Sequence, residues 1–230
     1  MLTVSALEQY YGASHTLRNL SLELAPGRIC CLLGRNGVGK TTFLNTLMGL
    51  VPARSGRIHL AGEALEALGT EDRVLRGMAY CPQGRMIFPD LTVQENLHLA
   101  LAGQRRRSAV IPARIYEFFP VLRDMARRRG GDLSGGQQQQ LAIGRALVLE
   151  PRFLLLDEPC EGIQPNIVQL IGNVLQALRE EGMGILLVEQ KLPFARSVGD
   201  EFAIMDRGAV VARGGIGELG DSLVDEYLTV

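Results

Sequence analysis

The sequence predicts an α/β fold: a mostly parallel sheet, a small antiparallel β subdomain and an inserted helical lobe. Short apolar runs, such as residues 153–156, alternate with helical patterns, as expected for strands that are covered on both faces. Residues 1–30 alternate between polar and apolar in short runs, which is typical of antiparallel strands. Residues 92–129 have a helical pattern that Pro112 and Pro120 break into pieces.

The bulk composition fits one large domain with no general attraction to nucleic acid. The 230 residues, 47% of them apolar, are enough for a single domain over residues 1–230 with a sizeable core. The formal net charge is only -1, and the basic runs at 105–107 and 127–129 are interpreted as solvated helix ends. The N-terminus lacks a signal-peptide pattern, and the apolar runs are too short to cross a bilayer. Any role at a membrane would therefore need another chain that spans it.

Cysteine and histidine usage argues against a metal site of the zinc type. The chain has four cysteines but no Cys-x-x-Cys pair, and its three histidines are scattered. Cys30 and Cys31 lie inside an apolar run. We interpret them as small buried hydrophobic residues of a protein in a reducing cytosol.

The first half of the chain is expected to contain several strands and one helix. Residues 28–33 form an apolar run that ends at a glycine, which predicts a buried strand. Residues 41–48 have the pattern of a helix, and Gly49 is expected to end it. Further short strands are expected at residues 57–60 and 78–81.

After the helical lobe, placed at about residues 84–135, helices and strands alternate again. A helix is expected from Ser134 to about Leu149. Apolar residues recur at helical spacing between Pro165 and Gly182, which predicts a second helix. Buried strands are expected at residues 153–156 and 183–188, and a hairpin at 201–213 that turns at 206–208.

A glycine-rich segment fits the pattern of a phosphate-binding loop between a strand and a helix. Backbone N–H groups and the helix N-terminus would cradle phosphates there, so an ordinary glycine-rich turn is the weaker interpretation. Lys40 would reach the β- and γ-phosphates of ATP, and the Thr41 hydroxyl would bind Mg²⁺. The expected nucleotide contacts in this segment are Gly34, Asn36, Gly37, Gly39, Lys40, Thr41 and Thr42.

Two acidic residues follow the apolar strand at 153–156. Asp157 would hold Mg²⁺, and Glu158 would orient or deprotonate the attacking water, a contribution of about 10²–10⁴ in rate. Gln83 follows the strand at 78–81, where its amide could bind Mg²⁺ or the water. A solvated strand end is the alternative for the acidic pair. The phosphate loop upstream makes that alternative weak.

Two further segments would complete a nucleotide site. Tyr11 could stack on adenine, although either Tyr10 or Tyr11 could instead belong to the core. Ser134, Gly135, Gly136 and Gln137 open a helix, so Ser134 could simply be its N-cap. The same residues could also form a second phosphate cradle. Two cradles in one chain predict head-to-tail pairing, in which each chain caps the ATP of the other.

Together these motifs resemble the ATP-binding subunits of ABC transporters over nearly the whole chain, and they are highly specific in combination. The resemblance implies a P-loop NTPase core of the ABC ATPase type. It identifies residues 34–41 with Walker A, Gln83 with the Q-loop and residues 133–137 with the signature. It likewise identifies Asp157 with the Walker B aspartate and Glu158 with the catalytic glutamate.

Within the family, the chain resembles importers for branched-chain amino acids, amides and urea. The stretches that carry this resemblance are 82–89 and 188–190, with the short C-terminus. Residues 133–143 and 161–165 are most similar to the second ATPase subunit of urea importers. Two positions depart from the wider family: Gln190 stands where histidine is usual, and Gln164 where aspartate is common. Gln190 is still expected to contribute to catalysis, in a site that these departures could make slow.

The resemblance implies an ATPase that powers uptake of a small polar solute, with urea first and a branched-chain amino acid or amide as the alternative. It implies a second, different ATP-binding subunit as dimer partner, two integral membrane permease subunits and, indirectly, a periplasmic solute-binding protein. The chain would lie peripherally on the cytoplasmic face of a bacterial inner membrane. Two other classes remain open: an ATPase of repair or translation, and a regulatory module that scarcely turns over.

Overall fold

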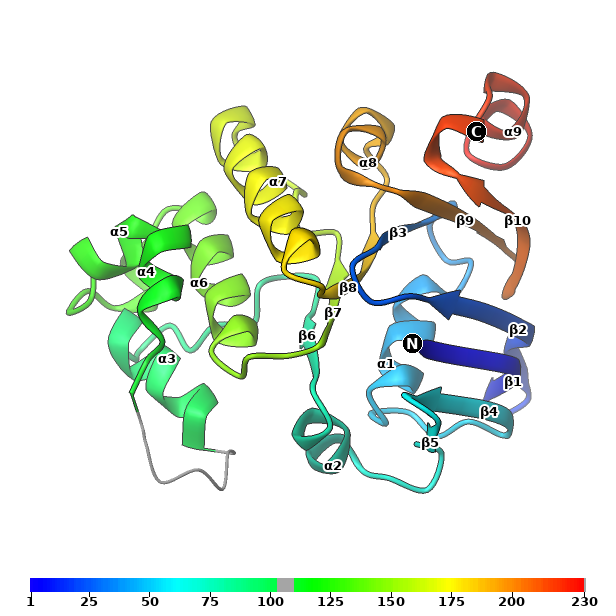
Figure 1. Ribbon diagram of the computed structural model, residues 1–230, viewed down its shortest axis with the longest axis horizontal. Helices are drawn as coiled ribbons and strands as arrows, with labels where there is room; N and C mark the ends of the chain where they lie inside the picture. Colours follow the sequence, from blue (N-terminus) through cyan, green and yellow to red (C-terminus); the bar gives the residue numbers. More distant parts are fainter. Residues whose placement is uncertain (103–109, 230) are drawn as a thin grey trace.

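Two sheets and a helix-rich lobe make up the described part of the chain, which is residues 1–102 and 110–229 of a computed structural model. Helices of the lobe lie at one end of the molecule and the antiparallel sheet lies at the other, with the second sheet between them (Figure 1). The predicted basic run at 105–107 falls outside the described residues.

The larger sheet has the order β10-β9-β3-β8-β7-β6. Five neighbouring strands pair in parallel, and β10 pairs antiparallel with β9 at the edge. The predicted hairpin is therefore confirmed, and its turn residues Arg207 and Gly208 both have positive φ, as a tight two-residue turn requires. The strands are β3 (Ile29–Leu33), β6 (Met78–Cys81), β7 (Phe153–Asp157), β8 (Gly184–Val188), β9 (Glu201–Asp206) and β10 (Ala209–Gly215).

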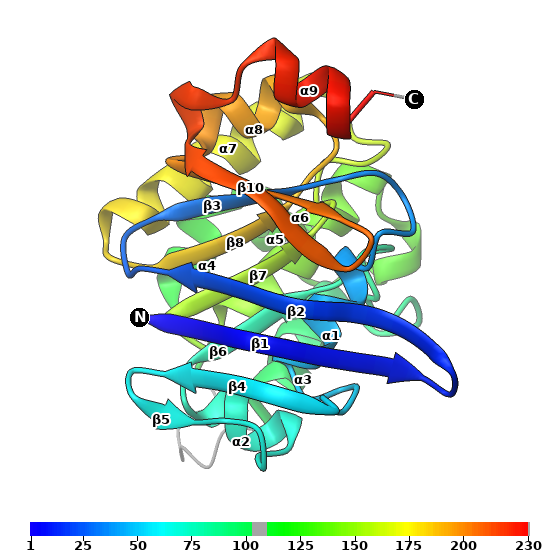
Figure 2. The same ribbon diagram turned by 90° about the vertical axis from the view of Figure 1, so that its right-hand side faces the viewer.

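The predicted antiparallel subdomain is also present. Its strand order is β2-β1-β4-β5, and the strands are visible beside those of the larger sheet in Figure 2. The strands are β1 (Leu2–Tyr11), β2 (Ser14–Leu24), β4 (Ser55–Leu60) and β5 (Glu63–Ala64). The sequence did not predict β5, because two exposed residues carry no hydrophobic pattern.

The predicted helices appear close to their expected bounds, together with several short ones that the sequence did not predict. The short helices α2, α8 and α9 span six or seven residues. That length is too short to display a helical period. The helices are α1 (Lys40–Leu47), α2 (Thr70–Leu75), α3 (Val93–Ala102), α4 (Ala113–Phe118), α5 (Pro120–Asp124), η1 (Gly130–Asp132), α6 (Gly135–Leu147), α7 (Pro165–Glu180), α8 (Leu192–Val198), η2 (Ile216–Glu218) and α9 (Asp221–Tyr227).

The larger sheet is buried on both faces, which explains its continuous apolar runs. Cys31 and Leu154 pack into a core shared with the helical lobe, α7 and α8. Their neighbours Cys30 and Leu155 pack on the opposite face, against α1 and the antiparallel sheet. All four cysteines are free and buried, as predicted for the pair at 30 and 31, and burial raises the pKa of the Cys30 thiol to about 12.

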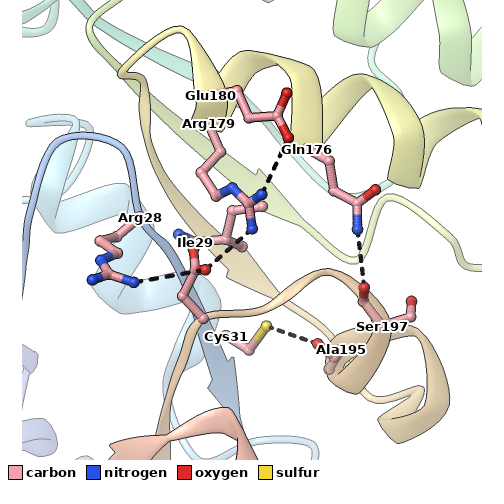
Figure 3. Close-up of polar contacts among 9 residues, drawn as sticks. Arg28, Ile29, Cys31, Gln176, Arg179, Glu180, Ala195 and Ser197 are labelled. Atoms are coloured by element: carbon pink, nitrogen blue, oxygen red, sulfur yellow. Dashed lines mark hydrogen bonds and ion pairs between the residues drawn. The ribbon is translucent and has the colours of Figure 1, made fainter.

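One carboxylate fixes the end of the larger sheet at which β3 begins. Asp200 Oδ2 accepts the Ile29 N–H at 2.8 Å, and Asp200 Oδ1 lies 3.1 Å from the Arg179 guanidinium and 3.8 Å from that of Arg28. Nearby, Gln176 of α7 donates to the carbonyl of Ser197 in α8 (Figure 3). Since β3 runs from Ile29 toward Gly34, this anchor lies at the end of the sheet opposite to the phosphate loop.

Candidate functional site

Four neighbouring parallel strands deliver the predicted site residues to one edge of the larger sheet. The strand β3 leads into Gly34, β8 into Glu189 and β6 into Pro82 and Gln83, whereas β7 ends at Asp157 itself. The register is tight, because Val188 pairs with both Leu32 and Asp157. Loops that are distant in sequence therefore begin side by side.

The phosphate-loop segment has the conformation that its glycines permit. Gly39 precedes α1 with φ 109°, in the region that residues with a side chain rarely adopt. Gly34 approaches the backbone of β9 so closely that a Cβ there would lie 2.3 Å from the Met205 carbonyl oxygen. A side chain at either position would displace the loop that leads into the first helix.

Lys40 is folded onto this loop and is only 5% exposed. Its Nζ donates to the carbonyl oxygens of Gly34 at 2.6 Å and Arg35 at 2.9 Å. Burial lowers the pKa of the ammonium, while the nearby carboxylates of Glu158 and Asp157 act in the opposite direction. The side chain thus supplies a desolvated positive charge inside the loop.

Asp157 and Thr41 form a pair of hard oxygen donors. The Thr41 hydroxyl donates to Asp157 Oδ2 at 2.8 Å, and the Tyr80 hydroxyl lies 3.4 Å from the same oxygen. The other oxygen, Oδ1, is buried and accepts no hydrogen bond from the described residues. Burial raises the pKa of the carboxyl. A buried oxygen without a partner beside a threonine hydroxyl fits a divalent cation such as Mg²⁺, which prefers oxygen ligands and uses few protein groups.

Glu158 lies at the centre of an amide–carboxylate network. The Gln190 Nε2 donates to Glu158 Oε1 at 2.5 Å and to Asn36 Oδ1 at 2.8 Å. The Gln83 Nε2 lies 3.2 Å from Glu158 Oε2 and 2.9 Å from Glu161 Oε2. Sequence motifs separated by up to 154 residues are thereby joined through side-chain contacts.

The sequence did not predict the side-chain contacts of Gln83 or the position of Gln164 directly before α7. Among the described residues, the Gln83 amide donates to the carboxylates of Glu158 and Glu161, rather than to Thr41 or Asp157. Gln164 immediately precedes α7, and its side chain makes no capping hydrogen bond to that helix. A role for Gln83 as a Mg²⁺ ligand therefore stays a prediction.

Ser134 forms a capping box at the start of α6. Its hydroxyl accepts the Gln137 N–H at 3.4 Å, and the Gln137 side chain accepts the Ser134 N–H at 2.9 Å. The expectation that Ser134 is an N-cap is confirmed. Among the described residues, no hydrogen bond or ion pair joins this motif to the phosphate loop of the same chain.

The two adjacent tyrosines are both exposed, so the alternative that they belong to the core is wrong. Tyr10 is 42% exposed and stacks on the His15 ring at a centroid distance of 4.1 Å. Tyr11 is 49% exposed at the end of β1. Within the described part of the chain, Tyr10 has a ring partner and Tyr11 has none, so Tyr11 is the better placed of the two for stacking on a base.

Glu189 is a buried site residue that the sequence analysis did not single out. It is 2% exposed, and its carboxylate accepts backbone N–H groups from both neighbouring loops. The signal was available, since Glu189 follows the apolar run at 183–188 just as the pair at 157 and 158 follows its own strand. Because acidic residues follow two neighbouring parallel strands, Glu189 could have been placed beside Asp157 and Glu158 from the sequence.

Comparisons with known proteins identify the class of protein. The family model for the ABC transporter matches residues 17–161, so the chain belongs to the ABC transporter family. Members of this class bind ATP and hydrolyse it to drive transport, and this chain is such an ATPase. The ABC ATPase fold predicted from the sequence is confirmed.

Individual relatives cover almost the whole chain. It is 40% identical to the "High-affinity branched-chain amino acid transport ATP-binding protein BraG" of Pseudomonas aeruginosa, over 92% of this chain and 91% of that protein. It is 34% identical to the "Probable branched-chain amino acid transport ATP-binding protein LivF" of Archaeoglobus fulgidus, over 95% and 94%. A solved ATP-binding subunit of an ABC transporter matches 98% of this chain and 92% of its own, with a TM-score of 0.84 and 29% identity.

Within residues 1–102 and 110–229, no helix combines the length and the apolar character that crossing a bilayer requires. The same residues contain no cluster of three or more His, Cys, Asp and Glu side chains that could hold a metal ion.

We expect Asp157→Asn to stabilise the nucleotide-free protein, because burial already disfavours the charged carboxylate and the amide has nearly the same shape. The free energy of unfolding should rise by about 1 kcal/mol, as is common when a functional buried charge is neutralised. Urea denaturation at pH 7 with EDTA measures it. The half-buried Glu158→Gln is the matched control, with a change within about 0.5 kcal/mol. A loss of stability in Asp157→Asn would mean that the hydroxyl contacts outweigh the desolvation of the carboxylate.

Proposed function

We propose that the chain is the ATP-binding subunit of an importer for branched-chain amino acids. The observation that carries this proposal is the 40% identity to a high-affinity branched-chain amino acid transport protein over 92% of the chain. The LivF relative supports the same substrate class. Urea, which motif details favoured in the sequence analysis, becomes the second candidate. The motifs at residues 133–143 and 161–165 are its support.

In this proposal the phosphate loop binds the ATP phosphates, with Lys40 directed at the β- and γ-phosphates once it leaves the Gly34 and Arg35 carbonyls. Tyr11 stacks on the adenine. Thr41 and Asp157 hold Mg²⁺, with Gln83 as a further ligand. When bound, Mg²⁺ offsets the negative charge of the β- and γ-phosphate oxygens.

Hydrolysis is an in-line attack of water on the γ-phosphate. Glu158 orients the water and accepts its proton, and Gln190 holds the Glu158 carboxylate through the 2.5 Å contact. The same Gln190 nitrogen donates to Asn36 of the phosphate loop, so the group that binds the phosphates and the group that aims the water are linked. The activation free energy is lowered mainly by positioning of the reacting groups and by electrostatic stabilisation of the γ-phosphoryl group.

The signature segment at residues 134–137 completes the site of a second ATP-binding subunit. The capping box fixes the N-terminus of α6, where Gly135 and Gly136 begin the helix. A helix N-terminus of this kind can bind an anion such as phosphate. We propose a heterodimer with a different ATP-binding subunit, carried by two permease subunits and served by a periplasmic binding protein. The complex lies on the inner membrane, with this chain on the cytoplasmic side.

Glu158→Gln is expected to keep ATP binding and to lower the steady-state hydrolysis rate by at least about 100-fold, because it removes the proton acceptor for water. The dimer should be trapped with ATP, as size-exclusion chromatography with radiolabelled ATP would reveal. Glu161→Gln is the matched control, since its carboxylate also accepts from Gln83 but lies outside the attack position. Hydrolysis at the wild-type rate in Glu158→Gln would remove Glu158 from the mechanism.

Ser134→Arg should leave the ATP affinity of the isolated chain within about twofold, because its own cradle is the phosphate loop. It should nevertheless abolish transport, since a long cationic side chain would occupy the seam between subunits. Equilibrium binding of a fluorescent ATP analogue to the monomer, beside uptake by the assembled transporter, separates the two effects. An equal loss of ATP affinity in the monomer would mean that the loop serves its own chain only.

The substrate class is tested by ATPase stimulation. The chain is purified with its permease, partner ATPase and solute-binding subunits, and ATP hydrolysis is measured with leucine, an aliphatic amide or urea present. Leucine should stimulate hydrolysis severalfold and urea should not. Stimulation by urea alone would overturn the branched-chain amino acid proposal and restore the urea candidate.

A further inference from the structure

Glu189 holds two loops of the candidate site at once. Its Oε1 accepts the Cys160 N–H at 3.1 Å, in the loop that follows β7. Its Oε2 accepts the N–H groups of Gln190 at 3.1 Å and Lys191 at 3.2 Å, in the loop that follows β8. Both carboxylate oxygens are therefore engaged by backbone donors.

Lys191 completes the connection. Its Nζ donates to the Cys160 carbonyl oxygen at 2.7 Å. The backbone N–H and C=O of Cys160 are thus both held by side chains of the β8 loop. Cys160 lies two residues after Glu158, and Gln190, directly after Glu189, donates to Glu158.

Joining two loops through a buried carboxylate costs free energy, because the charged group loses its hydration. Burial raises the pKa of Glu189, and hydrogen bonds from the backbones of both loops and from the Cys160 side chain oppose that effect. Apolar side chains of similar volume often serve a purely structural role as well or better. What a carboxylate adds is geometric: it fixes the donors' positions to within hydrogen-bond tolerances.

The contact that depends on this geometry is short. Gln190 Nε2 and Glu158 Oε1 are 2.5 Å apart, and the two residues belong to the two loops that Glu189 joins. A relative displacement of the loops by about 1 Å would break it, and misplacements of that size can cost about 100-fold in rate.

We propose that Glu189 is a positioning residue for ATP hydrolysis. It sets the Gln190 amide against the Glu158 carboxylate by holding the backbones of Gln190 and Cys160. This inference rests on the proposed roles of Glu158 and Gln190. In this proposal Glu189 acts through these two backbones and not by contact with ATP or the attacking water.

The test uses Glu189→Gln in the assembled transporter. The variant keeps the shape of the side chain, but its NH₂ group cannot accept from a backbone N–H. We expect kcat for ATP to fall about tenfold while KM changes by less than about twofold, because only alignment is lost. Glu189→Asp keeps the charge with a shorter reach, and should recover part of the lost kcat.

The matched control is Asp200→Asn. Asp200 also holds a backbone N–H, that of Ile29, and it binds the Arg179 guanidinium, but it lies at the end of β3 opposite to the phosphate loop. We expect Asp200→Asn to lower the melting temperature without changing kcat of the folded protein. An unchanged kcat in Glu189→Gln would overturn the proposal, and so would a kcat loss in Asp200→Asn equal to that in Glu189→Gln.

A double-mutant cycle with Gln190→Ala tests the route through the amide. If Glu189 acts through Gln190, the kcat loss in the double variant should be smaller than the product of the two single losses. A fully multiplicative loss would overturn the proposal. Failure of the proposed function would look different: Glu158→Gln would then hydrolyse ATP at the wild-type rate, whatever the cycle gave.

Discussion

The site depends on the parallel pairing of β3, β8, β7 and β6. Parallel strands end at the same edge of a sheet, and in this register Val188 pairs with both Leu32 and Asp157. The phosphate loop, the Gln190 loop, the acidic pair and Gln83 then begin on four consecutive strands at one edge of the sheet. A shift of one residue in any of these strands would turn its core side chains to the other face and separate the contacts.

Part of this arrangement could be predicted from sequence because it is local. The apolar runs at 153–156 and 183–188 reflect burial on both faces, and the glycines at 34 and 39 reflect backbone conformations of their own segment. The partners of a side chain are a different matter. Glu189 reads as one acidic residue after a strand, and only the fold brings Cys160 to it. Short helices such as α2 also escaped prediction, since their existence is decided by packing.

Three ionisable side chains at this edge of the sheet are buried, although burial disfavours their charged forms. Lys40, Asp157 and Glu189 are all at most 5% exposed, and burial shifts the pKa of each toward its neutral form. Lys40 and Glu189 recover hydrogen bonds from backbone groups, whereas one oxygen of Asp157 does not. Concentrated desolvation of this kind is typical of sites selected for chemistry rather than for stability. The unpartnered oxygen is where a cation would restore the balance.

Gln190 is one of the two positions at which the sequence is expected to depart from the wider family, and its contacts in this chain suit an amide. Its single amide nitrogen has two N–H donors, and the two acceptors are Asn36 and Glu158. An imidazole nitrogen has at most one N–H and could not serve both oxygens from one atom. The amide therefore connects the phosphate loop to the acidic strand end without adding a charge beside Glu158. A cationic side chain would supply stronger hydrogen bonds to phosphate, but it would give up this direct connection. The departure thus favours positioning over charge, in keeping with the buried carboxylate of Glu189 directly before it.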